Sequence, residues 1–322
     1  MTEPAKESGD RHWLAALLLQ QHQRLGSRLA RALALWRTLP FGARRRVRRR
    51  MALSAAGVAL LLALSAGPLA PPAHAAVITV NGTTCTLPMA IAAAQTDKVV
   101  GGCKKGTAGS DVISLNVDVT VATGGFAYYA SRVGLPKIVS PIVIEGNGHT
   151  IRRDPVNPDK FRLFTVGNFG DLTLSNVTLS GGYAFPFDDG TPFYQYFGDG
   201  GAVFNNGSLT LNNATITGNQ AHGDGGGIYN LDDVTLNSSV ISGNQAGNEG
   251  GGIYQYSAGG DYATLTLNKS TVSDNTAGGE GGGIYAYDGI VAIDRSTISG
   301  NTAMRGGGVT VTYESAQLTM TN

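Results

Sequence analysis

A short glycine-rich phrase recurs through residues 200–322, and this repeat constrains the fold more than any other feature of the chain. The phrase reads GGAVFN from Gly200. Its copies are GGGIYN from Gly225, GGGIYQ from Gly250, GGGIYA from Gly281 and GGGVTV from Gly306, at steps of 25, 25, 31 and 25 residues. A period of this length is typical of stacked supersecondary units, none of which buries a core alone.

A second phrase alternates with the first, and it has the pattern of short strands. Apolar residues and threonine alternate within it, as in Leu209-Thr210-Leu211, which is the period-two signal of a strand with one buried face. Each strand-like run ends at Gly, Asn or Asp, residues that tolerate left-handed backbone conformations. The copies are LTLSNVTLSGGYA from Leu172, LTLNNATITGNQA from Leu209, VTLNSSVISGNQA from Val234, LTLNKSTVSDNTA from Leu265 and VAIDRSTISGNTA from Val291.

The repeat predicts an all-β fold, a right-handed parallel β-helix. If each strand pairs with its copy one coil later, the strands are parallel and successive coils rise by roughly 4.8 Å. The apolar residues of successive copies then fill one continuous bore. One asparagine per copy occupies the same position, and we expect these side chains to form an amide ladder: Asn219, Asn244, Asn275 and Asn301.

The first 75 residues resemble an export signal behind a basic preface. The run RRRVRRR precedes Met51, an apolar segment follows, and Ala73-His74-Ala75 fits a cleavage site. We predict a signal peptide over residues 51–75, because the apolar segment is short for a membrane span and ends in prolines. Residues 1–50 are a basic N-terminal extension with two interpretations, a start codon assigned too far upstream or a long cytoplasmic n-region.

Charge divides the chain near the same point. Residues 1–76 hold 12 Lys or Arg against 3 Asp or Glu, a net charge of +9, whereas residues 77–322 hold 12 against 20, a net charge of −8. An acidic surface disfavours nucleic acid and anionic membrane as partners. We therefore predict an exported protein, extracellular or on the outer cell surface, with no nucleic-acid partner and no membrane span in the mature chain.

Residues 76–110 are predicted to cap the N-terminal end of the coil. Thr86–Gln95 is Ala-rich and helical in character, with Thr86 as the N-cap and Pro88 in the first turn. A helix there would cover the open end of the core, as repeat stacks require. Cys85 and Cys103 are 18 residues apart in an exported chain and are most simply one disulfide. Residues 111–322 are then the β-helix repeats, irregular at first.

Two parts of the chain resemble known groups of proteins. CTLPMAIAAAQ, a later Cys, DVISL and LPKIVSPIVIEGNGHTI are similar to the start of secreted bacterial proteins with a CSLREA-type motif. The later repeats resemble the GGAI and FxxN repeats of chlamydial polymorphic outer membrane proteins. This resemblance implies a secreted or cell-surface β-helix, often an adhesin or a stalk, with no catalytic residues to transfer. The sequence departs from the FxxN pattern in having an aliphatic residue in place of Phe at Ile216, Ile241, Val272 and Ile298.

The longest departure from the repeat is an insertion at residues 183–199, YAFPFDDGTPFYQYFGD. Insertions in repeat proteins form loops on one face, often the binding face. Aromatic rings beside carboxylates are suited to sugar rings, although the loop could instead fold its own rings over the coil. The residues of this candidate carbohydrate site are Phe185, Phe187, Asp188, Asp189, Phe193, Tyr194 and Tyr196.

Two columns of side chains flank the glycine phrase. One is acidic, and its like charges are expected to splay into water, with calcium binding as the alternative: Asp199, Asp224, Glu249 and Glu280. The other is aromatic, and its rings are expected to stack on one another and shield the turn, with glycan binding as the alternative: Phe204, Tyr229, Tyr254 and Tyr285.

The sequence favours display over catalysis. It has no Ser/His/Asp grouping, and the glycine triplets do not open a helix as nucleotide fingerprints do. We predict a non-enzymatic β-helix that presents a surface for adhesion to cell-surface glycans or a host matrix, with no cofactor. The alternatives are a β-helix polysaccharide lyase or glycoside hydrolase, and a purely structural stalk. The chain stops partway through another copy of the second phrase, at Gln317–Asn322, which predicts that the C-terminus is truncated.

Overall fold

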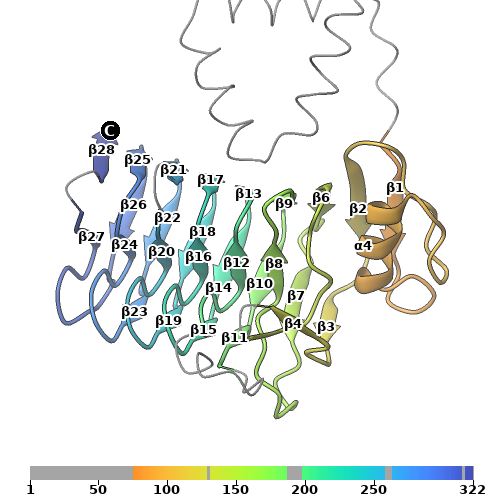
Figure 1. Ribbon diagram of the computed structural model, residues 1–322, viewed down its shortest axis with the longest axis horizontal. Helices are drawn as coiled ribbons and strands as arrows, with labels where there is room; N and C mark the ends of the chain where they lie inside the picture. Colours follow the sequence, from red (N-terminus) through yellow and green to blue (C-terminus); the bar gives the residue numbers. More distant parts are fainter. Residues whose placement is uncertain (1–74, 129–130, 187–197, 258–262, 314–315, 322) are drawn as a thin grey trace, which may run out of the picture. The chain divides into compact units, whose positions relative to one another are not determined.

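The strands of the second phrase stack in parallel from coil to coil, which confirms the predicted right-handed parallel β-helix (Figure 1). The structure is a computed structural model that describes residues 75–128, 131–186, 198–257, 263–313 and 316–321. Within these residues the longest sheet has nine strands and runs the length of the stack. Its members, in spatial order, are β1 (Val77–Val80), β2 (Asp111–Leu115), β6 (Pro141–Glu145), β9 (Asp171–Ser175), β13 (Ser208–Asn212), β17 (Asp233–Asn237), β21 (Thr264–Asn268), β25 (Ile290–Asp294) and β28 (Gln317–Thr321).

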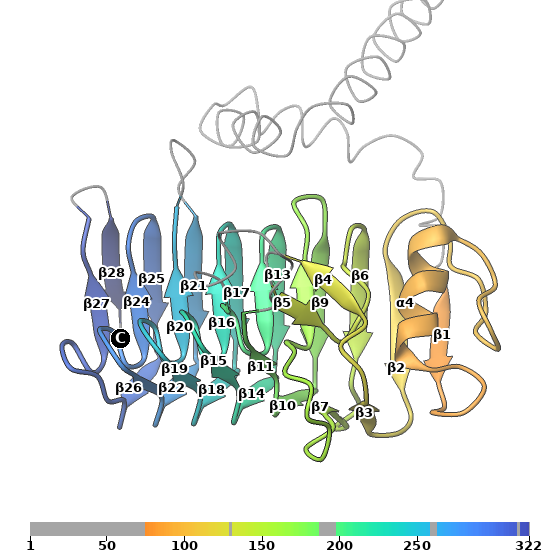
Figure 2. The same cartoon turned by 60° about the horizontal axis from the view of Figure 1, so that its bottom comes forward.

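Three shorter parallel sheets complete the sides of the coil in the described residues (Figure 2). The seven-stranded sheet contains β3 (Val119–Val121), β7 (Thr150–Arg153), β10 (Thr178–Ser180), β14 (Thr215–Thr217), β18 (Val240–Ser242), β22 (Thr271–Ser273) and β26 (Thr297–Ser299). The four-stranded sheet contains β11 (Tyr183–Ala184), β15 (Gln220–Ala221), β19 (Gln245–Ala246) and β23 (Thr276–Ala277). The six-stranded sheet contains β8 (Phe164–Val166), β12 (Val203–Asn205), β16 (Ile228–Asn230), β20 (Ile253–Gln255), β24 (Ile284–Ala286) and β27 (Val309–Val311). An antiparallel pair, β4 (Phe126–Tyr128) and β5 (Ser131–Val133), interrupts the early coils.

Each copy of the second phrase lies directly over the next, so like residues pack on like. Leu209 pairs with Val234, and Val234 pairs with Leu265, in strands whose residues are alternately buried and half-buried. These three side chains are at most 1% exposed. The inward residues of successive coils therefore form the continuous core that the alternation predicts.

The predicted asparagine ladder is present, and three of its members, Asn219, Asn244 and Asn275, are buried. Asn219 donates to Asn244 Oδ1 through both its backbone N–H and its side-chain Nδ2, each at 3.0 Å. Asn244 donates to Asn275 Oδ1 in the same two ways, at 2.9 Å, and Asn275 repeats the pattern with Asn301. Asn244 Nδ2 also donates to the Ile216 carbonyl at 3.0 Å. The ladder thus satisfies backbone groups at a corner where the sheet hydrogen bonds are interrupted.

The corners of the coil use left-handed backbone conformations, as the Gly, Asn and Asp residues at strand ends predict. Before the six-stranded sheet, Gly225 and Gly250 have φ of 65° and 64°. The next glycine of the triplet is required by space, because a Cβ on Gly226 would lie 2.3 Å from the Gly251 carbonyl oxygen. Between the nine-stranded and seven-stranded sheets, Gly148 has φ of 84°, but most of the left-handed residues are not glycine: Asn147, Asn176, Asn213, Ser238, Lys269 and Arg295.

Helix α4 (Leu87–Thr96) forms the predicted N-terminal cap and packs against β1 and β2 (Figure 1). Leu87, Ile91 and Ala94 lie on its buried face. Thr86 holds the N-cap position in an extended conformation, but its side chain makes no capping hydrogen bond. The disulfide between Cys85 and Cys103 is confirmed, with the two Cα atoms 4.7 Å apart.

The ten residues of α4 are too few to cross a bilayer, and the described part of the chain contains no helix of sufficient length and apolarity to do so.

Replacing Asn244 with Ala is expected to lower the free energy of unfolding by about 2–4 kcal/mol, because several buried backbone and amide groups lose their partners. Urea unfolding followed by circular dichroism measures the change. Gln245→Ala is the matched control, since that neighbouring side chain is exposed. Equal effects of the two substitutions would contradict a stabilising role for the ladder.

Candidate functional site

The four acidic residues before the glycine phrase form one column, but they do not all extend into water. The Asp224 backbone N–H donates to Asp199 Oδ1 at 3.0 Å, and the Glu249 backbone N–H donates to Asp224 Oδ1 at 3.1 Å. Asp199 is only 6% exposed. At the other end, Glu280 Oε1 lies 3.0 Å from Nε of Arg305. The expectation of splayed, solvated carboxylates is therefore wrong for Asp199, because the corner backbone draws the carboxylate inward as a hydrogen-bond acceptor.

Burial raises the pKa of three of these acids, Asp199, Asp224 and Glu249, and like charges raise the pKa of Asp224 and Glu249 further. Burial, followed by the nearby Asp199 charge, raises the pKa of Asp224 to about 7. Burial raises the pKa of Asp199, while the Asp224 backbone N–H and the Arg162 charge act in the opposite direction. Burial and then the Glu280 charge raise the pKa of Glu249. A stacked column of carboxylates thus binds protons near neutral pH more readily than separate surface acids do.

The predicted aromatic ladder lies beside the acidic column and confirms the interpretation of rings stacked on one another. Ring centroids are 5.2 Å apart for Phe204–Tyr229, 4.9 Å for Tyr229–Tyr254 and 5.3 Å for Tyr254–Tyr285, with interplanar angles of 9° to 13°. Phe204, Tyr254 and Tyr285 are 3–6% exposed. Burial, then the Asp224 charge, raises the pKa of Tyr254. We call these two columns together the acid–tyrosine strip.

A buried arginine closes one end of the strip. Arg162 is 0% exposed, and its guanidinium carbon lies 4.8 Å from the centroid of the Phe204 ring, within cation–π range. The same charge opposes the rise in the pKa of Asp199. Arg162 therefore couples the aromatic and acidic columns where the regular coils begin.

A second tyrosine ladder follows the first and is more accessible. Tyr256 and Tyr287 have ring centroids 5.4 Å apart, and Tyr287 and Tyr313 have centroids 5.0 Å apart. Tyr313 is 53% exposed, and the other two are half-buried. The sequence analysis missed this ladder, although the signal was available, because IYQY and IYAY place a second Tyr two residues after the first.

Of the candidate carbohydrate-binding residues in the insertion, Phe185 lies in the described structure. Its ring makes edge contacts with Tyr183, at a centroid distance of 5.8 Å, and with His222, at 5.1 Å. Lys160 Nζ lies 4.1 Å from the Phe185 centroid. The remaining members lie outside the described residues: Phe187, Asp188, Asp189, Phe193, Tyr194 and Tyr196.

Metal binding at the acidic column stays a prediction. Two of its carboxylates each use an oxygen to accept a backbone N–H, and Glu280 is paired with Arg305. Within the described ranges, no three His, Cys, Asp or Glu residues are placed to hold one ion together.

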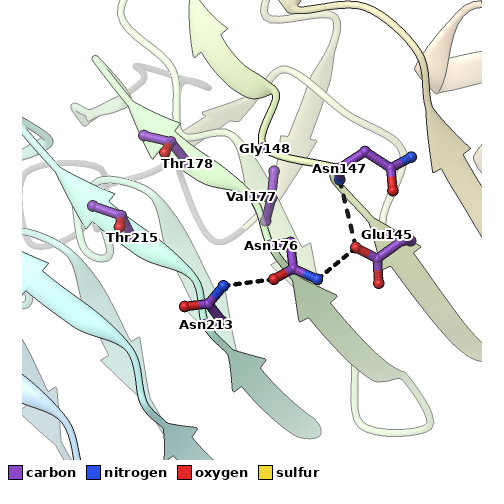
Figure 3. A pocket seen from close by; sticks show the side chains of 8 residues that line it. All are labelled: Glu145, Asn147, Gly148, Asn176, Val177, Thr178, Asn213 and Thr215. Atoms are coloured by element: carbon purple, nitrogen blue, oxygen red, sulfur yellow. Dashed lines mark hydrogen bonds between the residues drawn. The ribbon is translucent and has the colours of Figure 1, made fainter.

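A polar groove of about 340 Å³ lies at the corner between the nine-stranded and seven-stranded sheets (Figure 3). Asn213 Nδ2 donates to Asn176 Oδ1 at 2.6 Å, and Asn176 Nδ2 donates to Glu145 Oε1 at 2.8 Å. Thr178 and Thr215 contribute hydroxyl groups from the adjoining strands. This groove was not predicted from the sequence, in which asparagines at strand ends indicate only turns.

Three segments of the chain match the family model of the Chlamydia polymorphic membrane protein (Chlamydia_PMP) repeat: residues 213–231, 238–255 and 269–287. Each segment begins at a left-handed corner residue and continues through the glycine phrase into the six-stranded sheet. The chain therefore contains repeats of this kind. No curated protein and no solved structure is significantly similar to the chain.

Replacing Asp224 with Asn is expected to stabilise the fold above neutral pH by about 1–3 kcal/mol. Folding raises the pKa of Asp224 from 3.8 to about 7, so the wild type loses stability as the pH rises between these values. Asn keeps an oxygen for the Glu249 N–H and carries no charge. Melting temperatures at pH 3.5 and pH 8 measure the effect.

The two proteins should melt alike at pH 3.5 and differ at pH 8. Asp97→Asn, at an exposed position in the cap, is the control and should show no such difference. A variant that is less stable than the wild type at pH 8 would contradict the destabilisation ascribed to the buried charge of Asp224.

Proposed function

We propose that this chain is a surface-exposed, adhesion-type β-helix of an exported protein, which contacts saccharides with the side of its coil. The observation that carries the proposal is the repeat itself. The repeat matches a family model described as a Chlamydia polymorphic membrane protein repeat. In this chain the repeats form a stack whose coils are joined by backbone and side-chain amide hydrogen bonds. Such a stack is a stiff support for repeated surface groups.

The second tyrosine ladder is the part of the side face best suited to saccharides. Tyr256, Tyr287 and Tyr313 lie in a row along the stack, the first two half-buried and Tyr313 53% exposed. A tyrosine offers an apolar ring for the C–H groups of a sugar and a hydroxyl for its hydrogen bonds. The row follows the coil axis, so an extended chain of sugars could lie along several coils at once.

The chemistry of the acid–tyrosine strip argues against bond cleavage at this surface. Asp199 and Asp224 accept backbone N–H groups of the next coil, and the aromatic rings beside them are occupied by one another. A glycosidase or lyase needs carboxylates directed at a substrate in a groove. The strip therefore fits a structural role in which it holds successive coil corners together.

Replacing Tyr287 and Tyr313 together with Ser is expected to weaken saccharide binding at least about fivefold, because two of the three rings of the accessible ladder are lost. A glycan array followed by titration of the best ligand measures the change. Phe169→Ser is the matched control, since Phe169 is 51% exposed in the same kind of turn of an earlier coil and makes no ring–ring contact within the described part of the chain.

Three results would contradict the proposal. Unchanged binding by the tyrosine variant would exclude this ladder as the contact. A blank array for the wild type would favour a structural stalk. Shortened polysaccharide products after incubation with pectin or alginate would favour an enzyme.

A further inference from the structure

The polar groove is built from a recurring sequence motif with a chemical meaning. Asn-x-Ser/Thr is the acceptor sequence for asparagine-linked glycosylation in exported proteins. Two such triplets, Asn176-Val177-Thr178 and Asn213-Ala214-Thr215, line the groove side by side. Across the chain the motif occurs at Asn81, Asn176, Asn206, Asn213, Asn237 and Asn268.

The groove triplets present both of their functional side chains outward. Asn176 and Asn213 are exposed and occupy left-handed corner positions, with φ of 50° and 49°. Thr178 and Thr215 begin β10 and β14 at half-buried, outward-facing positions. Figure 3 shows the two asparagines and the two threonines along the same edge of the coil. The acceptor amide and the hydroxyl are therefore both open to an approaching enzyme.

In the next two coils the Asn-x-Ser triplets begin one residue earlier, relative to the strands, than the groove triplets do. This shift buries their serine hydroxyls. Asn237 is the last residue of β17, so Ser239 points inward and is 1% exposed. Ser239 Oγ donates to the Asn237 carbonyl at 2.9 Å and accepts the Ala214 N–H at 3.1 Å. Asn268 and Ser270 repeat this arrangement. A shift of one residue along a strand moves a side chain to the opposite face.

The hydrogen bonds in the groove are compatible with a sugar on either amide. Each amide nitrogen has two hydrogens, and the bonds from Asn213 to Asn176 and from Asn176 to Glu145 use one hydrogen each. Replacing the second hydrogen by a sugar carbon leaves both bonds intact. The groove beside them is an open space of about 340 Å³ in which the first sugar can lie.

We propose that Asn176 and Asn213 are acceptor sites for asparagine-linked glycosylation of the folded chain. The co-substrate is a sugar activated by a phosphate leaving group. A bond forms between asparagine Nδ2 and the sugar C1 while the bond from C1 to the phosphate oxygen breaks, and one Nδ2 proton passes to a base of the transferase. Asn237 and Asn268 are not modified in the folded state, because their serine hydroxyls are buried.

The test treats the folded full chain with a sequon-specific glycosyltransferase and its activated sugar donor, and measures each asparagine by peptide mass spectrometry. Occupancy at Asn176 and Asn213 is expected to exceed that at Asn237 and Asn268 at least about tenfold. Thr215→Ala should abolish modification of Asn213 and leave Asn176 unchanged, whereas Thr215→Ser should retain both. The heat-denatured chain should lose the preference, because unfolding exposes all four triplets.

Similar occupancy at all four sites of the folded chain would overturn the proposal, as would an unmodified Asn176 and Asn213. A preference that persists after denaturation would show that local sequence, and not the register of the coil, sets it. Protein from the native source with bare Asn176 and Asn213 would exclude these residues as glycosylation sites in the cell. None of these outcomes depends on whether the side face binds saccharides.

Discussion

The structure depends on one constraint, the in-register stacking of each coil on the next. Parallel backbone pairing places every residue of one copy over its equivalent in the following copy, as for Leu209, Val234 and Leu265. Asparagine is well suited to this constraint, since its amide can accept from the coil on one side and donate to the coil on the other. The ladder from Asn219 to Asn301 does so at a corner where the backbone N–H of each of Asn219, Asn244 and Asn275 bonds to a side-chain oxygen of the next coil.

The same constraint has opposite consequences for different side chains. Aromatic rings stacked at about 5 Å pack well, as Tyr229 and Tyr254 do. Carboxylates at the same spacing repel, and burial raises the pKa of Asp224 to about 7. The column is tolerated because backbone N–H groups bond to Asp199 and Asp224, and because Arg305 is paired with Glu280 at its far end. Stacking therefore fixes the electrostatics of the corner along with its shape.

Function in such a fold lies on the outside of the coil, because the bore is filled by the core. The polar groove and the second tyrosine ladder occupy different sides, one at the corner before the seven-stranded sheet and the other after the six-stranded sheet. A single chain can thus carry a modified edge and a contact face without interference between them. The matched Chlamydia repeat covers the part of each unit that turns these corners.

The sequence alone determined the architecture. Its period, its alternation of apolar and polar residues, its glycines and its recurrent Asn predicted the parallel coil, the amide ladder and the stacked rings, because each is a local pattern repeated at a fixed interval. The Ala-rich segment and the two cysteines, which occur once, predicted the cap helix and its disulfide. The tertiary structure decided which exterior groups are accessible. Asp199 is buried by backbone N–H groups of the next coil, and Tyr313 joins a ladder with a different spacing in sequence. Asn213 and Asn237 are the first residues of the same Asn-x-Ser/Thr motif, but the Thr215 hydroxyl faces outward and the Ser239 hydroxyl is buried. The difference comes from the strand register, because a shift of one residue along a strand moves a side chain to the opposite face.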